Sequence, residues 1–199
     1  MFRRLLAIAL LLASTSTPFA QEDDASDSLA LVLSCGTGED ASEGFLSLKG
    51  QPVEGKTGFA TLQFFEEAKG VAAAPWPADG ATGPAQFQSS NSFGPEGAFT
   101  DIRFERDGQS WHIYNFTGPW KQDEPQDGAA GLVVLDADGS VVRDVPCAER
   151  MFVYLDVLQA TTQCDSEGPL GAATCTGAEV HRTRPLSELY PWFTAGDAP

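Results

Sequence analysis

The sequence has little of what the common hydrolases use for catalysis. It contains only two histidines, His112 and His181, and it shows no G-x-S-x-G, no H-E-x-x-H, and no S-x-x-K with its companion motifs. Each of those patterns places a nucleophile or a metal ligand beside a base, so their absence disfavours the familiar serine and metal hydrolases. The sequence therefore favours a protein without catalytic activity.

Metal-binding spacing is also missing. No two of the four cysteines, Cys35, Cys147, Cys164 and Cys175, are separated as in C-x-x-C, and the two histidines are far apart. Zinc sites in proteins need closely placed Cys and His ligands, so we expect no metal and no cofactor. An even number of cysteines in an exported chain usually forms disulfides.

Basic residues are scarce, at 12 against 28 acidic ones, for a formal net charge of −16. Without Arg3 and Arg4, which precede the first apolar run, ten basic residues face the same 28 acidic ones, and the net charge is −18. Such a charge repels nucleic acid and anionic membranes, so we expect no nucleic-acid partner. A negative charge of this size favours binding of a cationic protein or ligand, or of divalent cations. A role in solubility alone is the simpler explanation of the charge.

No hydrophobic run is long enough to span a membrane. The run that follows the two N-terminal arginines stops near Ala13, short of the roughly 20 residues that a transmembrane helix needs. Residues 1–20 therefore predict a signal peptide cleaved between about Ser16 and Ala20, with no membrane anchor after its removal. We expect a soluble protein of the periplasm or the extracellular space, with a disordered acidic lead-in at 21–28 and a single β-rich domain at 29–199.

Two hairpins are the clearest structural signals. Strand-like segments at 98–106 and 109–116 flank Asp107-Gly108, which suits a type I′ turn because both of its central residues need positive φ. Segments at 131–135 and 140–145 flank a second turn, DADG. Alternation on the return strand of the first hairpin puts Trp111, Ile113 and Asn115 on one face and Ser110, His112, Tyr114 and Phe116 on the other. The predicted fold is mainly β, or α+β at the margin: an antiparallel β-sandwich or barrel with one late helix and two disulfides.

The late helix is predicted at about 147–163, where apolar residues recur with helical spacing and Asp144 can act as an N-cap. A strand is the alternative, because FVYLDVL also alternates. A helix here would be roughly 25 Å long, whereas disulfide-bonded Cα atoms lie about 4.4–6.8 Å apart. Cys147 then cannot reach Cys164. The Gly- and Pro-containing loop after Cys164 can turn back, so we predict Cys164–Cys175 and Cys35–Cys147.

Three side chains are candidates for facing a ligand: Trp76, His112 and Tyr114. Trp76 lies in a Pro- and Gly-rich loop at 72–84, where it either forms a binding lip or pins the loop to the core. His112 has a side chain suited to general-base catalysis, but the sequence identifies neither a nucleophile nor an orienting carboxylate beside it. A histidine on the sheet surface is the simpler interpretation.

The C-terminal segment carries a basic cluster followed by apolar residues, Leu186, Leu189, Tyr190, Trp192 and Phe193. We expect it to dock across the sheet as a C-terminal strap; an exposed aromatic patch for a partner is the alternative.

Three hypotheses for function follow. The first is a non-catalytic binding protein whose acidic surface meets a cationic protein or ligand. The second is a hydrolase with a site near His112 or His181. The third is a calcium-stabilised structural protein with Asp136 and Asp138 as ligands, although DADGS lacks the later acidic ligands of known calcium loops and suits a hairpin turn better.

Overall fold

The computed structural model describes residues 29–119, 128–152 and 155–193. The predicted signal peptide, the acidic lead-in at 21–28 and the last six residues of the predicted domain lie outside these ranges. The strands are β1 (Ala30–Thr37), β2 (Gly44–Gly50), β3 (Gln63–Ala68), β4 (Val71–Ala72), β5 (Gln88–Gly94), β6 (Gly97–Arg106), β7 (Gln109–Thr117), β8 (Gly128–Leu135), β9 (Val141–Phe152), β10 (Gln163–Cys164) and β11 (Val180–His181). The helices are α1 (Gly83–Gln86), α2 (Leu155–Thr161) and α3 (Leu186–Leu189), with 3-10 turns η2 (Glu39–Ala41), η3 (Gly80–Thr82) and η4 (Gly171–Cys175).

All the strands belong to one sheet, in the order β10-β5-β6-β7-β8-β9-β1-β2-β3-β4, with β11 also paired to β5. Among the strands of the described ranges, only β10 and β11 run parallel to their neighbour. The predicted fold class, mainly β and mostly antiparallel, is confirmed. None of the helices in the described ranges is both long and apolar enough to cross a membrane.

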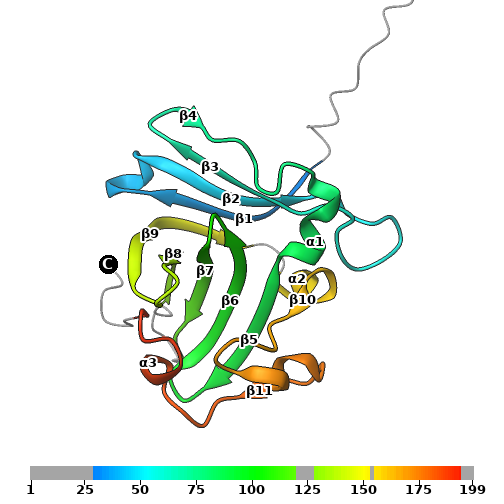
Figure 1. Ribbon diagram of the computed structural model, residues 1–199, viewed down its shortest axis with the longest axis vertical. Helices are drawn as coiled ribbons and strands as arrows, with labels where there is room; N and C mark the ends of the chain where they lie inside the picture. Colours follow the sequence, from blue (N-terminus) through cyan, green and yellow to red (C-terminus); the bar gives the residue numbers. More distant parts are fainter. Residues whose placement is uncertain (1–28, 120–127, 153–154, 194–199) are drawn as a thin grey trace, which may run out of the picture.

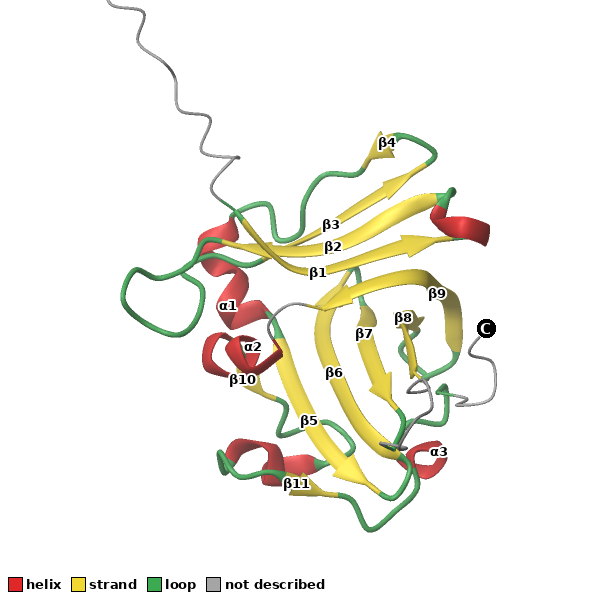
Figure 2. Ribbon diagram, turned by 180° about the vertical axis from the view of Figure 1, so that it is seen from behind, coloured by secondary structure: helices red, strands yellow, loops and turns green. Residues whose placement is uncertain are grey.

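Strand β9 joins two halves of the sheet. Its first residues, 141–146, pair with β8, and its last, 147–152, pair with β1. The sheet turns along β9, so that the β1–β4 layer faces the curved β5–β8 layer (Figures 1 and 2). This arrangement is a sandwich whose two layers share a strand.

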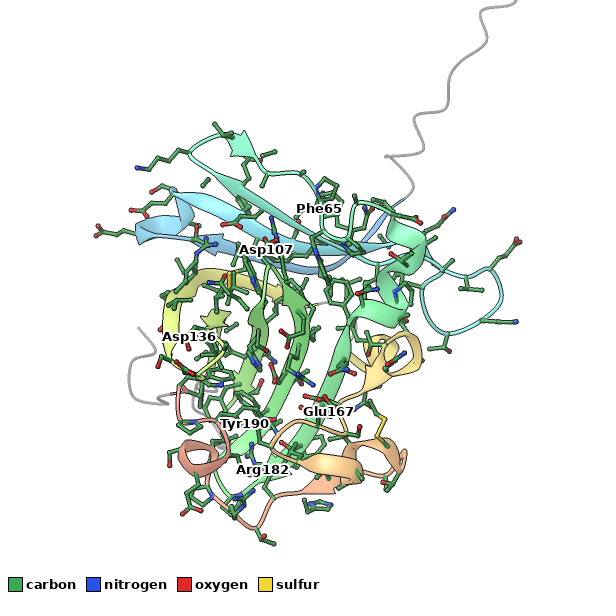
Figure 3. All side chains as sticks on the ribbon, in the orientation of Figure 1. Phe65, Asp107, Asp136, Glu167, Arg182 and Tyr190 are labelled. Atoms are coloured by element: carbon green, nitrogen blue, oxygen red, sulfur yellow. A yellow bond between two sulfur atoms is a disulfide. The ribbon has the colours of Figure 1, made fainter. Side chains whose placement is uncertain are left out.

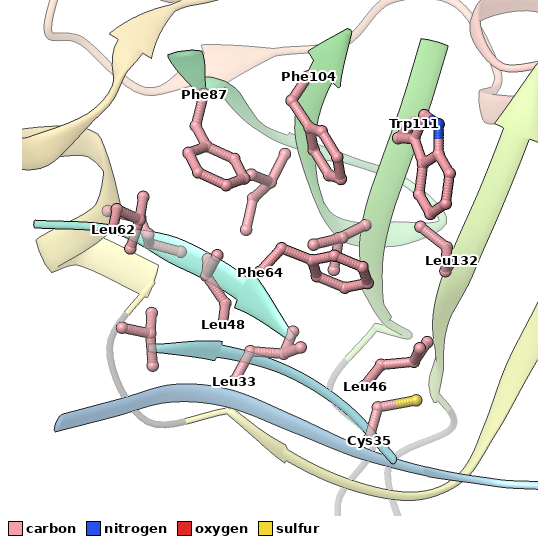
Figure 4. Close-up of a cluster of buried hydrophobic side chains, with 14 of the residues drawn as sticks. Leu33, Cys35, Leu46, Leu48, Leu62, Phe64, Phe87, Phe104, Trp111 and Leu132 are labelled. Carbon is pink, nitrogen blue, oxygen red and sulfur yellow. The ribbon is translucent and has the colours of Figure 1, made fainter. Parts of the chain in front are cut away.

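The main core fills the space between the two layers. Leucines of β1 and β2 meet Phe87, Phe104 and Trp111 of the opposite layer, with Phe64 of β3 between them (Figure 4). Phe64 and Phe104 lie 5.5 Å apart, centroid to centroid. Burying large apolar side chains from both layers holds the bent sheet closed.

A second core lies on the opposite face of β6, β7 and β8. It combines Phe99, Tyr114, Phe116, Val133 and Leu135 of the strands with Leu186, Leu189, Tyr190 and Phe193 of the C-terminal segment. Residues 182–193, which we call the C-terminal strap, therefore pack intramolecularly on the sheet. The central layer is covered on both faces.

The first hairpin has the predicted turn, with φ of 55° at Asp107 and 76° at Gly108. Its ladder runs from Arg106 opposite Gln109 to Ala98 opposite Thr117, and the predicted alternation holds: Trp111 and Ile113 face the main core. The second hairpin is also confirmed, with Gly139 at φ 80°.

The late helix is shorter than predicted. Residues 147–152 form the second part of β9, and α2 begins only at Leu155 and ends at Thr161. The prediction of helix over 147–152 was wrong because this segment alternates as well as it repeats helically, and its ladder to β1 supplies backbone partners that an isolated helix start lacks.

Both predicted disulfides are present, and all four cysteines are used. Cys35 and Cys147 have Cα atoms 5.2 Å apart, and Cys164 and Cys175 have theirs 5.1 Å apart. The first pairing arises from the β1–β9 ladder rather than from a helix that keeps Cys147 away from Cys164. Two disulfides indicate an oxidising, extracytoplasmic setting.

Candidate functional site

His112 lies at the centre of a buried polar cluster on the strap-covered face of the sheet. Its side chain projects from β7 away from the main core and is 5% exposed. Asp101 of β6, on the same face, is 1% exposed. A carboxylate this deeply buried needs hydrogen-bond donors, and His112 provides one.

The hydrogen bonds run through His112 in a chain. Its Nδ1 lies 3.0 and 3.1 Å from the two carboxylate oxygens of Asp101, so it donates to that carboxylate. Its Nε2 lies 3.1 Å from Oγ of Ser110. We call Asp101, His112 and Ser110 the Ser110 cluster. Ser110 is half-buried, so its hydroxyl is the part of the cluster nearest to solvent.

The hairpin register places these three residues together. Ser110 and His112 are two apart on one strand and share a face. Arg103 pairs directly with His112, and Asp101 pairs with Tyr114, which puts Asp101 diagonally beside His112. Sequence reasoning missed both partners of His112, although the predicted type I′ turn fixes this register.

Burial and Asp101 act on the pKa of His112 in opposite directions. Burial lowers the pKa of His112, but the charge of Asp101 and its hydrogen bond to Nδ1 outweigh burial, so the pKa lies above the ordinary 6.5. Arg103 lowers the pKa of His112 and Asp165 raises it, each through its charge. The imidazolium form is therefore stabilised by folding.

This shift makes stability depend on pH. Because the pKa of His112 is raised in the folded protein, its stabilising contribution is complete below the unfolded value and is lost as pH rises through the folded value. Between about pH 6 and about pH 9, where carboxylates stay ionised, the wild-type free energy of unfolding should fall more than that of His112→Gln. Urea titrations across this range measure the difference, and an NMR titration of His112 gives its pKa directly. A midpoint at or below 6.5 would contradict the assignment.

Arg103 joins the cluster to the loop after β10. Its Nε and Nη2 donate to the two carboxylate oxygens of Asp165 at 3.1 and 2.7 Å, and Nη2 also donates to Gln88. Its Nη1 donates to Glu105 at 3.3 Å. Asp165 is almost fully buried, so this two-point ion pair anchors the disulfide-closed loop to the sheet.

A polar cavity of about 380 Å³ lies beside Arg103. We call it the Arg103 cavity; its lining is Ala85, Gln86, Gln88, Arg103, Phe104, Glu105 and Glu167. Two of these residues are cross-strand partners of the Ser110 cluster, because Arg103 lies opposite His112 and Glu105 lies opposite Ser110. None of the three residues of the Ser110 cluster lines the cavity itself.

The C-terminal strap covers the remainder of this face (Figure 3, where Tyr190 and Arg182 are labelled). The ring of Trp192 lies 5.2 Å from that of His112, centroid to centroid. Arg182, fully buried, donates from Nη2 to the carbonyl oxygen of Gly97 at 2.7 Å and lies 3.9 Å from Glu96. Glu96 in turn accepts the backbone N–H of Leu186 at 3.0 Å. The strap is thereby fastened to the β5–β6 turn.

The three candidate ligand-facing residues do not share a site. Trp76 packs at the edge of the main core, with its ring 4.5 Å from Phe104. His112 and Tyr114 lie on the opposite face beneath the strap. Burial, together with the negative charge of Asp144, raises the pKa of Tyr114 to about 12.

The other residues that the sequence suggested as catalytic or metal-binding candidates also lie apart from His112. His181 is exposed on β11, 3.7 Å from Glu179. Oδ1 of Asp136 accepts the backbone N–H groups of Asp138 and Ser140, as expected of a hairpin turn. Within residues 29–119, 128–152 and 155–193, no group of three or more His, Cys, Asp or Glu side chains is arranged to hold a metal.

An open groove of about 530 Å³ lies on the outward face of the β1–β3 layer. We call it the outer groove; its lining is Leu29, Leu31, Ser34, Phe45, Ser47, Lys49, Phe65, Glu66, Glu67, Ala72 and Ala73. Phe45, 51% exposed, is paired across the strands with the exposed Glu67. Lys49 lies over the ring of Phe65 at 5.1 Å. The groove has an apolar floor with carboxylates along one side.

Searches of family models, curated proteins and solved structures found nothing that matches this chain.

Proposed function

We propose that this chain is an exported binding protein of the periplasm or the extracellular space whose partner is cationic and amphipathic. The observation that carries the proposal is the outer groove, where Phe45 is 51% exposed and lies across the strands from the exposed Glu67. Large exposed aromatic side chains on a sheet face are costly to leave in water, and such patches mark interaction sites.

Charge supports a cationic partner. The chain carries a net charge of −16, which attracts basic proteins and peptides over a distance and repels acidic ones. Glu66 is engaged by Arg143, which does not line the outer groove, whereas Glu67 is exposed. Glu67 is therefore the carboxylate best placed to meet a basic side chain.

Export is supported by two independent features. The sequence pattern of residues 1–20 is that of a secretory signal, and the two disulfides form in an oxidising compartment.

The test uses two defined probes, a peptide of alternating lysine and leucine and its glutamate-leucine counterpart. We expect the lysine peptide to bind, more weakly at high salt, and the glutamate peptide not to bind. Phe45→Ser and Glu67→Lys should each weaken binding by about tenfold, or ~1.4 kcal/mol, in isothermal titration calorimetry.

Val142→Ser is the matched control, because Val142 is also 51% exposed but does not line the groove. Equal binding of the two peptides, or an equal loss in Val142→Ser and Phe45→Ser, would rule out the outer groove as the site.

A further inference from the structure

The sequence identified neither a nucleophile nor an orienting carboxylate beside His112. In the Ser110 cluster the imidazole of His112 contacts both, a hydroxyl at one ring nitrogen and a carboxylate at the other. Asp101 fixes the proton of His112 on Nδ1, which leaves Nε2 of the neutral ring free to accept the Ser110 proton. A serine hydroxyl is a weak nucleophile until a positioned base takes its proton. The order carboxylate, imidazole, hydroxyl is the arrangement that activates serine on unrelated folds.

Ser110 is more accessible to solvent than the other two residues of the cluster. Asp101 and His112 are buried beneath Trp192, which keeps water from their hydrogen bonds, while Ser110 is half-buried near the Asp107-Gly108 turn. The Arg103 cavity lies along the β5 side of β6, and Ser110 of β7 is not among its lining residues.

A positive group lies near Ser110, because Arg103 pairs across the strands with His112 and its partner Glu105 pairs with Ser110. Nε and Nη2 of Arg103 are held by Asp165 and Gln88, whereas Nη1 donates to Glu105, whose side chain is 61% exposed. An ion pair to so exposed a carboxylate is weak and easily exchanged. Nη1 is thus available to stabilise an oxygen that gains negative charge.

We propose that Ser110 is a nucleophile that takes the acyl group of a small ester, with His112 as the general base. The activity is separate from the proposed binding function, and it revises the expectation of a non-catalytic protein. Trp192 and Asp101 act as positioning residues, since they touch His112 and not the ester.

The steps balance without any further reactant than water. Oγ of Ser110 forms a bond to the carbonyl carbon and the bond from that carbon to the leaving oxygen breaks; the Oγ proton passes through Nε2 of His112 to the leaving oxygen. Water then attacks the acyl carbon, the bond from Oγ breaks, and the water proton returns through Nε2 to Oγ.

The experiment is reaction of the exported chain, without its signal, with p-nitrophenyl acetate. Nitrophenolate release gives the rate, and mass spectrometry of proteolytic peptides locates the acetyl group. We expect acetyl-Ser110, formed at least ~100-fold faster than any adduct of Ser110→Ala. Ser187→Ala, which alters an exposed serine of α3, is the control and should react as the wild type does.

The pH dependence of acetylation in the wild type tests the role of His112 as the base without any substitution. Acetylation of the wild type should rise with pH and level off above the pKa of His112, because only the neutral imidazole accepts the proton. In Asp101→Asn the midpoint should move to lower pH and the plateau should fall, which a purely structural role of Asp101 would not produce. An adduct confined to other residues, or an undiminished rate in Ser110→Ala, would overturn the proposal.

Discussion

Replacing Cys35 and Cys147 together with alanine should lower the free energy of unfolding by roughly 5 kcal/mol, enough to unfold many small domains. The disulfide closes a loop with a sequence separation of 112 residues, so its removal frees a large part of the unfolded chain. Cys147 is also the first residue of β9 that pairs with β1, immediately after Pro146, the last that pairs with β8. The bond therefore fastens the strand at the point where it passes from one layer to the other.

The second disulfide gives a matched control. Cys164 and Cys175 are 11 residues apart, and the same entropy model assigns their bond roughly 3 kcal/mol. Both of these residues are exposed, whereas Cys35 is 1% exposed. Mild reduction followed by alkylation should therefore modify Cys164 and Cys175 first. Guanidinium unfolding of the two double variants measures the stabilities; a smaller loss for the Cys35–Cys147 pair than for Cys164–Cys175 would contradict this account.

Local patterns in the sequence were sufficient for the central hairpin. Asp107-Gly108 fixes a two-residue turn, and alternation then assigns each residue of β7 to a face. The same reasoning, extended across the turn, places Asp101 beside His112. The Ser110 cluster was therefore predictable, because all three of its residues lie in one hairpin and their positions depend only on its register.

Contacts between distant segments were not predictable in this way. Asp165 reaches Arg103 and Arg182 reaches Gly97 only after the chain has crossed the sheet, and no local pattern encodes either pairing. Residues 147–152 show the same limit, since their pattern fits helix and strand equally and the ladder to β1 decides between them. Tertiary partners override local preference where that preference is weak.

The outer groove could be predicted from the sequence only in part. Its side chains alternate outward along β2, where Phe45, Ser47 and Lys49 share the exposed face. Alternation identifies such a face, but whether another layer covers it depends on where the chain goes next. Here β4 and the segment that follows it border the groove rather than cover it, so that Phe45 stays exposed.

The second large effect is expected at Tyr190, the largest fully buried side chain of the C-terminal strap. Its ring packs on Phe99 at 4.6 Å and on Trp192 at 5.5 Å, and its hydroxyl lies 3.2 Å from Oγ of Ser90. Burial raises the pKa of Tyr190 well above its ordinary value, so the hydroxyl stays neutral. Tyr190→Ala removes the ring and leaves a cavity, which should cost roughly 3–5 kcal/mol of unfolding free energy.

Tyr190→Phe separates the hydroxyl from the ring. It keeps the packing on Phe99 and loses only the hydrogen bond to Ser90, so we expect a loss of about 1 kcal/mol. Thermal unfolding of both variants, with amide hydrogen exchange along β6 and β7, distinguishes a strap that is part of the cooperative fold from one that merely rests on it. In the first case Tyr190→Ala lowers the melting temperature and speeds exchange throughout both strands. In the second, the melting temperature stays unchanged and exchange rises only in residues 182–193, which would show that the face carrying His112 folds without its cover.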